Sequence, residues 1–236
     1  MKLLIFNKKT LYLILLLLIF VIIIPIIVLN YGRSKDVFMQ DIFYEGTNGE
    51  KVISFACNID WGEEYIPEML KIFEENNIKI TFFPTGKWAE KNQDLLKEIY
   101  KKGHEIGNHG YSHLDYDKLD YNRNFEEIER ANKIIRDIID KNPSYFAPPS
   151  GAFNDYTLQA AKALNYKVIM WSIDTIDWRE DSTKDLIVKR VIDKAHNSAI
   201  VLMHPTENTK NALSEIIIEL TKMGYKIGNI SDVFNN

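Results

Sequence analysis

Two of the chain's five histidines, His109 and His113, lie four residues apart in a segment rich in glycine, asparagine and serine. Positions i and i+4 share one face of a helical turn, so the two imidazoles can converge on one point. Neutral imidazole is the commonest protein ligand for divalent transition metals. The spacing therefore predicts half of a metal site, whose remaining ligand comes from another part of the chain.

A carboxylate upstream and a histidine downstream complete a plausible hydrolytic set. Asp60 supplies the carboxylate, and His204 follows the apolar run 199–203. A metal held by two histidines and one carboxylate keeps open positions, where it acidifies bound water and polarises a carbonyl group. This is the equipment for hydrolysing an amide or an ester. His204 is the candidate acid that protonates the leaving group, with Asp177 orienting it.

Each of these residues taken alone also has a plainer interpretation. A histidine beside a turn is often a surface or capping residue, and an aspartate is often a helix cap or a turn residue. Their joint occurrence in this order favours a site, because separate structural roles explain the combination poorly.

A repeated strand-then-helix rhythm would position these side chains. Strand-like runs alternate with segments of helical spacing, and the runs lie at 51–57, 79–83, 104–107, 145–147, 167–171, 199–203 and 225–228. The alternation predicts about seven parallel strands covered by helices, and both an open sheet and a closed barrel fit it. Ligands bind at the carboxyl ends of strands in either architecture. Polar or special residues follow five of the runs, at Asn58 and Asp60, His109, Pro148 and Pro149, Asp174 and Asp177, and His204.

The N-terminal region predicts a membrane anchor. Residues 11–29 form an uninterrupted apolar run, which as a helix spans about 30 Å, the thickness of a bilayer core. Three lysines precede the run and favour a cytoplasmic N-terminus. We expect residues 1–10 in the cytoplasm, an uncleaved signal anchor at 11–29, a tether at 30–50, and a domain at 51–236 outside the cytoplasm at the cell membrane.

Charge and cysteine content exclude several classes of protein. The formal net charge is −4 and no dense Lys/Arg patch occurs, which gives no support for nucleic acid as a partner. The single cysteine, Cys57, excludes an intrachain disulfide and any multi-cysteine zinc cluster.

Four short motifs follow one another between residues 109 and 204. They are His109-Gly-Tyr-Ser-His113, Phe146-Ala147-Pro148-Pro149-Ser150-Gly151, Asp174-Thr-Ile-Asp177-Trp178 and Leu202-Met203-His204. Together with Thr81-Phe82-Phe83 they resemble the motifs of the polysaccharide deacetylases that share the NodB homology domain, carbohydrate esterase family 4. The resemblance covers about residues 51–235.

The resemblance implies a distorted (β/α) barrel and a metal-dependent removal of acetyl groups from N-acetylated sugars in polymers such as peptidoglycan. The implied metal is zinc, with cobalt or manganese as alternatives, and its ligands would be Asp60, His109 and His113. His204 would be the acid, assisted by Asp177. The implied substrate-binding residues are Pro149, Ser150, Trp178 and Leu202.

Two positions depart from the family's pattern. The family's first motif reads Thr-Phe-Asp-Asp-Gly, with a base aspartate before a metal aspartate. An ungapped alignment puts Asn58 at the base position, and a two-residue shift instead puts Asp60 and Trp61 on the two aspartates. Ala147 stands where the family has an arginine that sits against the base. Losing both charges together avoids an unpaired buried arginine and favours the ungapped register.

These departures set two hypotheses against each other. An amide cannot accept a proton at neutral pH, and a positioned base contributes about 10²–10⁴ in rate. The first hypothesis is a membrane-anchored hydrolase with reduced activity on an N-acetylated or O-acetylated polysaccharide. The alternative is a degenerate relative that binds glycan or metal without efficient turnover.

Overall fold

The computed structural model describes residues 8–39 and 42–235, and the chain divides into two compact units, Met1–Gln40 and Asp41–Asn236. The first unit contains α1 (Lys8–Met39), a helix of 32 residues with Pro25 inside it. Most of the predicted cytoplasmic segment lies outside the described residues. Among the described residues, no helix is long and apolar enough to cross a membrane. The anchor predicted at 11–29 stays a prediction.

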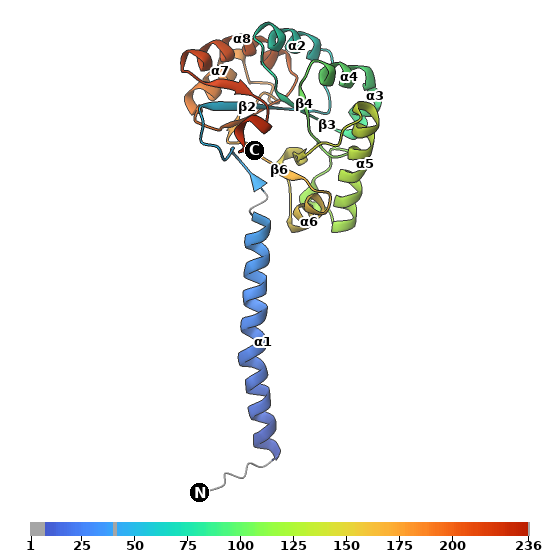
Figure 1. The fold of residues 1–236 in the computed structure, drawn as a ribbon, viewed down its shortest axis with the longest axis vertical. Coiled ribbons are helices and arrows are strands. Elements are labelled where there is room, and N and C mark those ends of the chain that lie inside the picture. Colours follow the sequence, from blue (N-terminus) through green and yellow to red (C-terminus); the bar gives the residue numbers. More distant parts are fainter. Residues whose placement is uncertain (1–7, 40–41, 236) are drawn as a thin grey trace. The chain divides into compact units, whose positions relative to one another are not determined.

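The second unit is a parallel α/β fold, as predicted (Figure 1). One sheet has the order β4-β3-β2-β8-β7, with β9 also paired to β2, and the other has the order β1-β6-β5. All of these strand pairs are parallel. The strands are β1 (Ile42–Phe43), β2 (Val52–Ile59), β3 (Thr81–Pro84), β4 (Glu105–Ile106), β5 (Tyr145–Phe146), β6 (Lys167–Ile169), β7 (Ile173–Asp174), β8 (Ile200–Met203) and β9 (Lys226–Gly228).

The barrel implied by the resemblance is not one continuous sheet but is divided into these two sheets. A single parallel bridge between Asn108 and Phe146 links β4 to β5. On the other side the chain changes sheets within three residues, because Met170 donates its N–H to Phe43 of β1 and Ser172 donates to Ile200 of β8. The predicted strand 167–171 is therefore the shorter β6 followed by a separate β7.

The short strand β1 corrects the predicted tether. Ile42 and Phe43 pair with Val168 and Ile169 of β6, and Gly46 donates its N–H to the carbonyl of Ser198. Residues 42–50 therefore belong to the second unit. The apolar pair at 42–43 is too short to give a periodicity signal in sequence.

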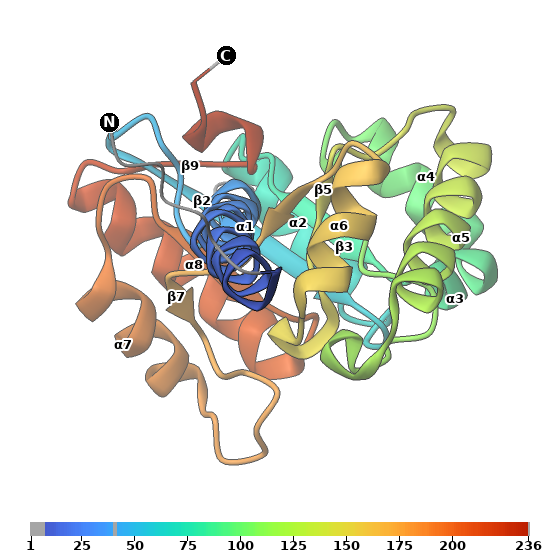
Figure 2. The ribbon, with the colours of Figure 1, turned by 90° about the horizontal axis from the view of Figure 1, so that it is seen from below.

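Helices surround the strands of the second unit (Figure 2). They are α2 (Ile66–Glu75), α3 (Gly86–Lys91), α4 (Gln93–Lys101), α5 (Tyr121–Ile139), α6 (Asp155–Ala163), α7 (Lys184–Lys194) and α8 (Glu207–Lys222), with 3₁₀ turns at Tyr116–Lys118, Pro149–Gly151 and Ser231–Val233. Two helices lie between β3 and β4, because Asn92 ends α3 and precedes α4.

The strand β2 lies at the centre of its sheet, and all eight of its residues are buried. Successive side chains of a strand point to opposite faces. The odd-numbered residues of β2, such as Phe55 and Ile59, join the large cluster under the helices. The even-numbered Val52 and Ala56 join a smaller cluster on the other face. This alternation places Asn58, and Asp60 just beyond the strand, on the face opposite the helix-covered core.

Candidate functional site

The carboxyl ends of the strands surround a cavity of about 390 Å³. It is lined by Asn58, Asp60, Trp61, His109, His113, Ser150, Trp171, Asp174, Trp178, Leu202 and His204. The structure therefore brings together most of the side chains that the sequence selects. Asp177 and Pro149 are buried and are not among the lining residues.

The end of β2 supplies an amide and a carboxylate to this cavity. Asn58 is 4 % exposed, and within the part of the chain that the structure describes its Oδ1 has no hydrogen-bond partner. Asp60 accepts a hydrogen bond of 2.7 Å from the hydroxyl of Thr85. Thr85 is fully buried and also caps the N-terminus of α3, where its Oγ1 accepts the N–H of Trp88. The first turn of α3 therefore fixes one oxygen of the Asp60 carboxylate.

The two histidines of the 109–113 segment converge, but not through a helical turn. The segment is a loop in which Gly110 and His113 have φ of 72° and 55°. The ring centroids of His109 and His113 are 5.2 Å apart and the rings are nearly perpendicular, at 71°. The prediction that the two histidines share one face of a helical turn was wrong, and left-handed backbone conformations bring the two rings together instead.

The tautomer of His109 is fixed by the chain after β5. Its Nδ1 lies 2.7 Å from the carbonyl oxygen of Ala147, so Nδ1 carries the proton and Nε2 is the free ring nitrogen. The ring is 1 % exposed. The pKa of His109 is lowered to about 3, first by burial and then by the neighbouring His113, and the hydrogen bond to the Ala147 carbonyl offsets only part of this. His109 is a neutral imidazole, which is the form that binds metals.

A buried carboxylate on α5 braces the loop between the histidines. Glu127 is 2 % exposed and accepts the backbone N–H of Ser112 at 2.8 Å. Its charge is paired with Arg123 at 2.8 Å, one helical turn earlier. Glu127 could not be recognised from the sequence, because on an amphipathic helix a glutamate beside the apolar stripe looks like an ordinary surface residue.

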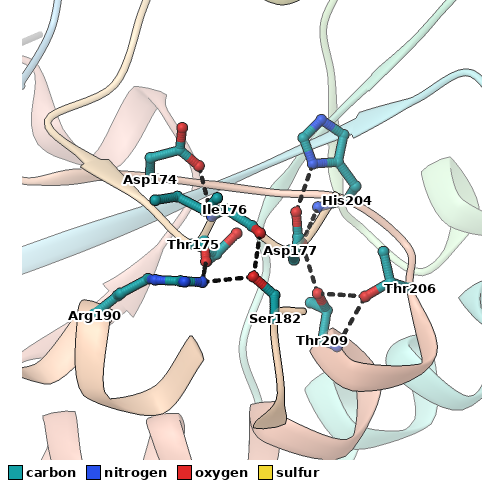
Figure 3. A network of polar contacts seen from close by, with 9 residues as sticks. All are labelled: Asp174, Thr175, Ile176, Asp177, Ser182, Arg190, His204, Thr206 and Thr209. Carbon is teal, nitrogen blue, oxygen red and sulfur yellow. Dashed lines mark hydrogen bonds and ion pairs between the residues drawn. The ribbon is translucent and has the colours of Figure 1, made fainter. Parts of the chain in front are cut away.

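The downstream histidine, His204, contacts the fully buried side chain of Asp177 (Figure 3). His204 Nδ1 lies 2.7 Å from Asp177 Oδ1, and the His204 backbone N–H donates to Oδ2 at 2.7 Å. Oδ2 also accepts the hydroxyl of Thr209 at 2.5 Å. The carboxylate of Asp177 is an acceptor, so Nδ1 of His204 is its donor and Nε2 is left free. The ring of Trp61 stacks on His204, with centroids 6.1 Å apart.

The loop after β7 is held from the side of α7 (Figure 3). Arg190 donates to the carbonyl of Thr175 and to the hydroxyl of Ser182, both at 2.7 Å. Asp174 accepts the N–H of Ile176, whose φ of 53° is unusual for a β-branched residue. Nothing in the sequence pattern marks Arg190, because its partners lie on a loop whose conformation cannot be predicted from hydrophobic periodicity.

The remaining predicted substrate-binding residues form one wall and the rim. Ser150 has φ of 56° in the 3₁₀ turn Pro149–Gly151 and is exposed at the cavity. Leu202 is 4 % exposed, and Trp178 is 58 % exposed. With Trp61 and Trp171, three of the chain's four tryptophans line this one cavity.

The predicted metal ligands are of the residue types that bind a divalent ion, but their side chains are not arranged around a common point. Two imidazoles and a carboxylate are zinc ligands, and the Ala147 carbonyl on His109 Nδ1 is the support that a ligating histidine needs. Over residues 8–39 and 42–235, however, no group of three or more histidine, cysteine, aspartate or glutamate side chains is arranged to hold a metal ion. Asp60, His109 and His113 share the cavity without forming a closed ligand set.

Comparison with known proteins identifies the family. The polysaccharide deacetylase family model matches residues 45–169. The chain is 38 % identical over 192 residues to the uncharacterised protein YlxY of Bacillus subtilis. This alignment covers 81 % of this chain and 60 % of the length of YlxY. It is also 30 % identical over 197 residues to the peptidoglycan-N-acetylmuramic acid deacetylase PdaA of Bacillus subtilis. That alignment covers 82 % of this chain and 75 % of the length of PdaA.

A solved structure agrees with this assignment. The fold matches the crystal structure of BA3943, a CE4 family pseudoenzyme from Bacillus anthracis, with a TM-score of 0.79 and 36 % identity over 81 % of this chain and 68 % of that one. A BA3943 mutant with restored enzymatic activity matches with the same TM-score. The family model covers more than half of the chain, so this chain belongs to the polysaccharide deacetylase family.

Proposed function

We propose that this chain is a deacetylase-type hydrolase with reduced activity, acting on N-acetyl or O-acetyl groups of a cell-wall or surface polysaccharide. The observation that carries the proposal is the contact of His204 Nδ1 with the buried Asp177 carboxylate, because His204 lines the same cavity as His109 and His113. The substrate class rests on the similarity to PdaA, whose own name gives peptidoglycan N-acetylmuramic acid as its substrate.

In this proposal His204 is the acid. Asp177 fixes the Nδ1–H tautomer and stabilises the charged imidazolium, so Nε2 is the atom that gives a proton to the departing amine or alcohol. The tryptophans at the rim present apolar ring faces on which the C–H face of a sugar can pack. Solvent is excluded on the Asp177 side, because its side chain is fully buried.

The proposed cofactor is a divalent metal, zinc before cobalt or manganese, on Asp60, His109 and His113. Bound there, it would polarise the acetyl carbonyl and acidify a water molecule. The neutral, oriented imidazole of His109 supports this assignment. Grouping the three ligands requires a movement of side chains relative to this structure, since the three are not arranged as a closed set among the described residues.

A second candidate function is binding of an acetylated glycan without efficient turnover. It is favoured by Asn58, whose amide cannot act as a base, and by Ala147, which stands where the family has an arginine. Asn58 is buried at the cavity with an unsatisfied Oδ1, which is the condition expected of a position that has lost its partner. The similarity to the pseudoenzyme BA3943 is consistent with this candidate.

Acetate release tests the first candidate. The purified chain with zinc or cobalt is incubated with acetylated chitooligosaccharides and with peptidoglycan fragments, and acetate is measured against the His109→Ala/His113→Ala variant. We expect slow release that depends on both histidines, and a stoichiometric metal that is lost in the variant. Release no faster than the variant on every substrate would reject the hydrolase and leave the glycan binder, which quenching of tryptophan fluorescence by the same sugars would detect.

We further propose that residues 11–29 anchor the chain in the cell membrane with the domain outside the cytoplasm. The apolar run supports the proposal, and the lysines before it favour this orientation. In cells that express the full chain, the protein should sediment with membranes, resist extraction by high salt and be degraded by protease added outside. Release by salt alone, or protection of the domain from external protease, would contradict it.

A further inference from the structure

The hydroxyl of Thr209 is placed where it can control the Asp177–His204 pair. Thr209 lies in the first turn of α8 and is fully buried. Its Oγ1 is 2.5 Å from Asp177 Oδ2, the carboxylate oxygen that does not contact the imidazole ring. Thr209 therefore approaches Asp177 from the side opposite the imidazole ring of His204, as Figure 3 shows.

The directions of these hydrogen bonds follow from donor counting. A carboxylate only accepts, so the single O–H of Thr209 points at Asp177. The lone pairs of Thr209 Oγ1 are then free to accept, and the hydroxyl of Thr206 donates to it at 2.9 Å. Thr206 is the N-cap of α8, and its own Oγ1 accepts the backbone N–H of Thr209 at 3.0 Å. The hydroxyls of Thr206 and Thr209 are therefore each held in one orientation by these hydrogen bonds at the N-terminus of α8.

This arrangement gives the Asp177 carboxylate three donors, which are the hydroxyl of Thr209 and the ring and backbone N–H groups of His204. The N-terminal turn of α8 adds a favourable field for the negative charge. A buried carboxylate that loses one of its donors is left with an uncompensated lone pair, and one of the contacts that hold it against rotation is gone. Rotation about its Cβ–Cγ bond would carry Oδ1 away from His204 Nδ1.

We propose that Thr209 is a positioning residue that, through Asp177, fixes the tautomer and orientation of His204. The inference rests on the proposed role of His204 as the acid. Thr209 touches neither the cavity nor the imidazole, and acts through the carboxylate alone. The motifs that carry the resemblance end at His204, so nothing in them marks a threonine five residues later.

The test measures the tautomer of His204 directly, by ¹⁵N chemical shifts of its imidazole nitrogens at a pH where the ring is neutral. Wild type is expected to be the Nδ1–H form. Thr209→Val keeps the shape and removes the hydroxyl, and should raise the population of the Nε2–H form roughly tenfold. Thr209→Ser restores the hydroxyl and should return the wild-type spectrum.

Thr157→Val is the matched control. Thr157 occupies the same position in the first turn of α6, is fully buried, and has its hydroxyl bonded to Asn154 and Tyr116 rather than to the pair. It should leave the His204 tautomer unchanged. An unchanged tautomer in Thr209→Val, or the same change in Thr157→Val, would overturn the proposal.

A second variant covers the case in which Thr209→Val does not fold. Thr206→Val leaves Thr209 in place but removes the hydroxyl that orients it, and should raise the Nε2–H population roughly threefold. No change in that folded variant would count against the proposal. The tautomer is read without any substrate, so failure of the proposed hydrolase function leaves this result interpretable. In a catalytically active background, Thr209→Val should lower kcat roughly tenfold with KM nearly unchanged.

Discussion

The double variant Asn58→Asp/Ala147→Arg is expected to release acetate roughly 10²–10⁴ times faster than the natural chain, the contribution of one positioned general base. Asn58 lines the cavity from the end of β2, so an aspartate there faces the same space as His109 and His204. The resemblance to the polysaccharide deacetylases implies that the arginine at position 147 sits against this base. Initial rates on acetylated chitooligosaccharides with added zinc measure the gain.

The effects of the two substitutions on stability should not be additive. Asn58→Asp alone puts a carboxylate at a buried position, where loss of solvent favours the protonated form that is no base. Ala147→Arg alone puts a cation into a cluster of apolar side chains that includes Ala56, Phe83 and Ile169, without a counter-ion. We expect each single variant to be less stable than the natural chain, and the double variant to recover part of that loss.

A third substitution controls for a nonspecific gain. Adding His204→Ala to the double variant should remove most of the new activity, because the acid is then missing while the base is present. Thermal unfolding of all five proteins (the natural chain, the two single variants, the double variant and the triple variant) shows which rates refer to folded chains. A folded double variant that is no faster than the natural chain would contradict the idea that Asn58 and Ala147 alone limit turnover. It would indicate instead that the incomplete set of metal ligands is limiting.

The sequence predicted the position of the site better than its internal geometry. Parallel strands gather their carboxyl ends at one edge, so residues such as Asp60 and His204 could be placed together from their order along the chain. The His109–His113 pair was correctly expected to converge but for the wrong reason, since helical spacing does not describe a loop with left-handed residues. Loop conformation depends on contacts such as Glu127 with Ser112, which come from another element.

The register of the first motif shows a physical limit on sequence reasoning. Side chains of a strand alternate between faces with a period of two, so a two-residue shift keeps a residue on the same face. Asn58 and Asp60 satisfy the inward pattern equally well, and both line the cavity. Ile59, between them, points to the other face, into the core under the helices. Thr209 and Arg190 were missed for the opposite reason, since they have no motif and act through tertiary contacts.

Gly110→Ala is expected to lower the free energy of unfolding by about 2–5 kcal/mol. Gly110 has φ of 72°, which L-residues rarely adopt. A Cβ atom at this position would meet Tyr116 Oη at 1.9 Å. The segment cannot move aside easily, because Gly110 donates its N–H to Asn108 and accepts the N–H of Gly86. Urea unfolding of the purified chain measures the change.

Two further variants separate the backbone cost from the collision. Gly49→Ala has a similar φ of 66° but no atom within 4 Å of the new Cβ, so it should lose only about 1–2 kcal/mol. Tyr116→Phe removes the oxygen nearest to the new methyl group and should recover part of the loss in Gly110→Ala, but not all, because the ring carbon beneath it is still 2.8 Å away. Equal losses in Gly110→Ala and Gly49→Ala would show that the collision is relieved by movement of the loop. That movement would carry His109 and His113 with it, so a change in their metal affinity would accompany it.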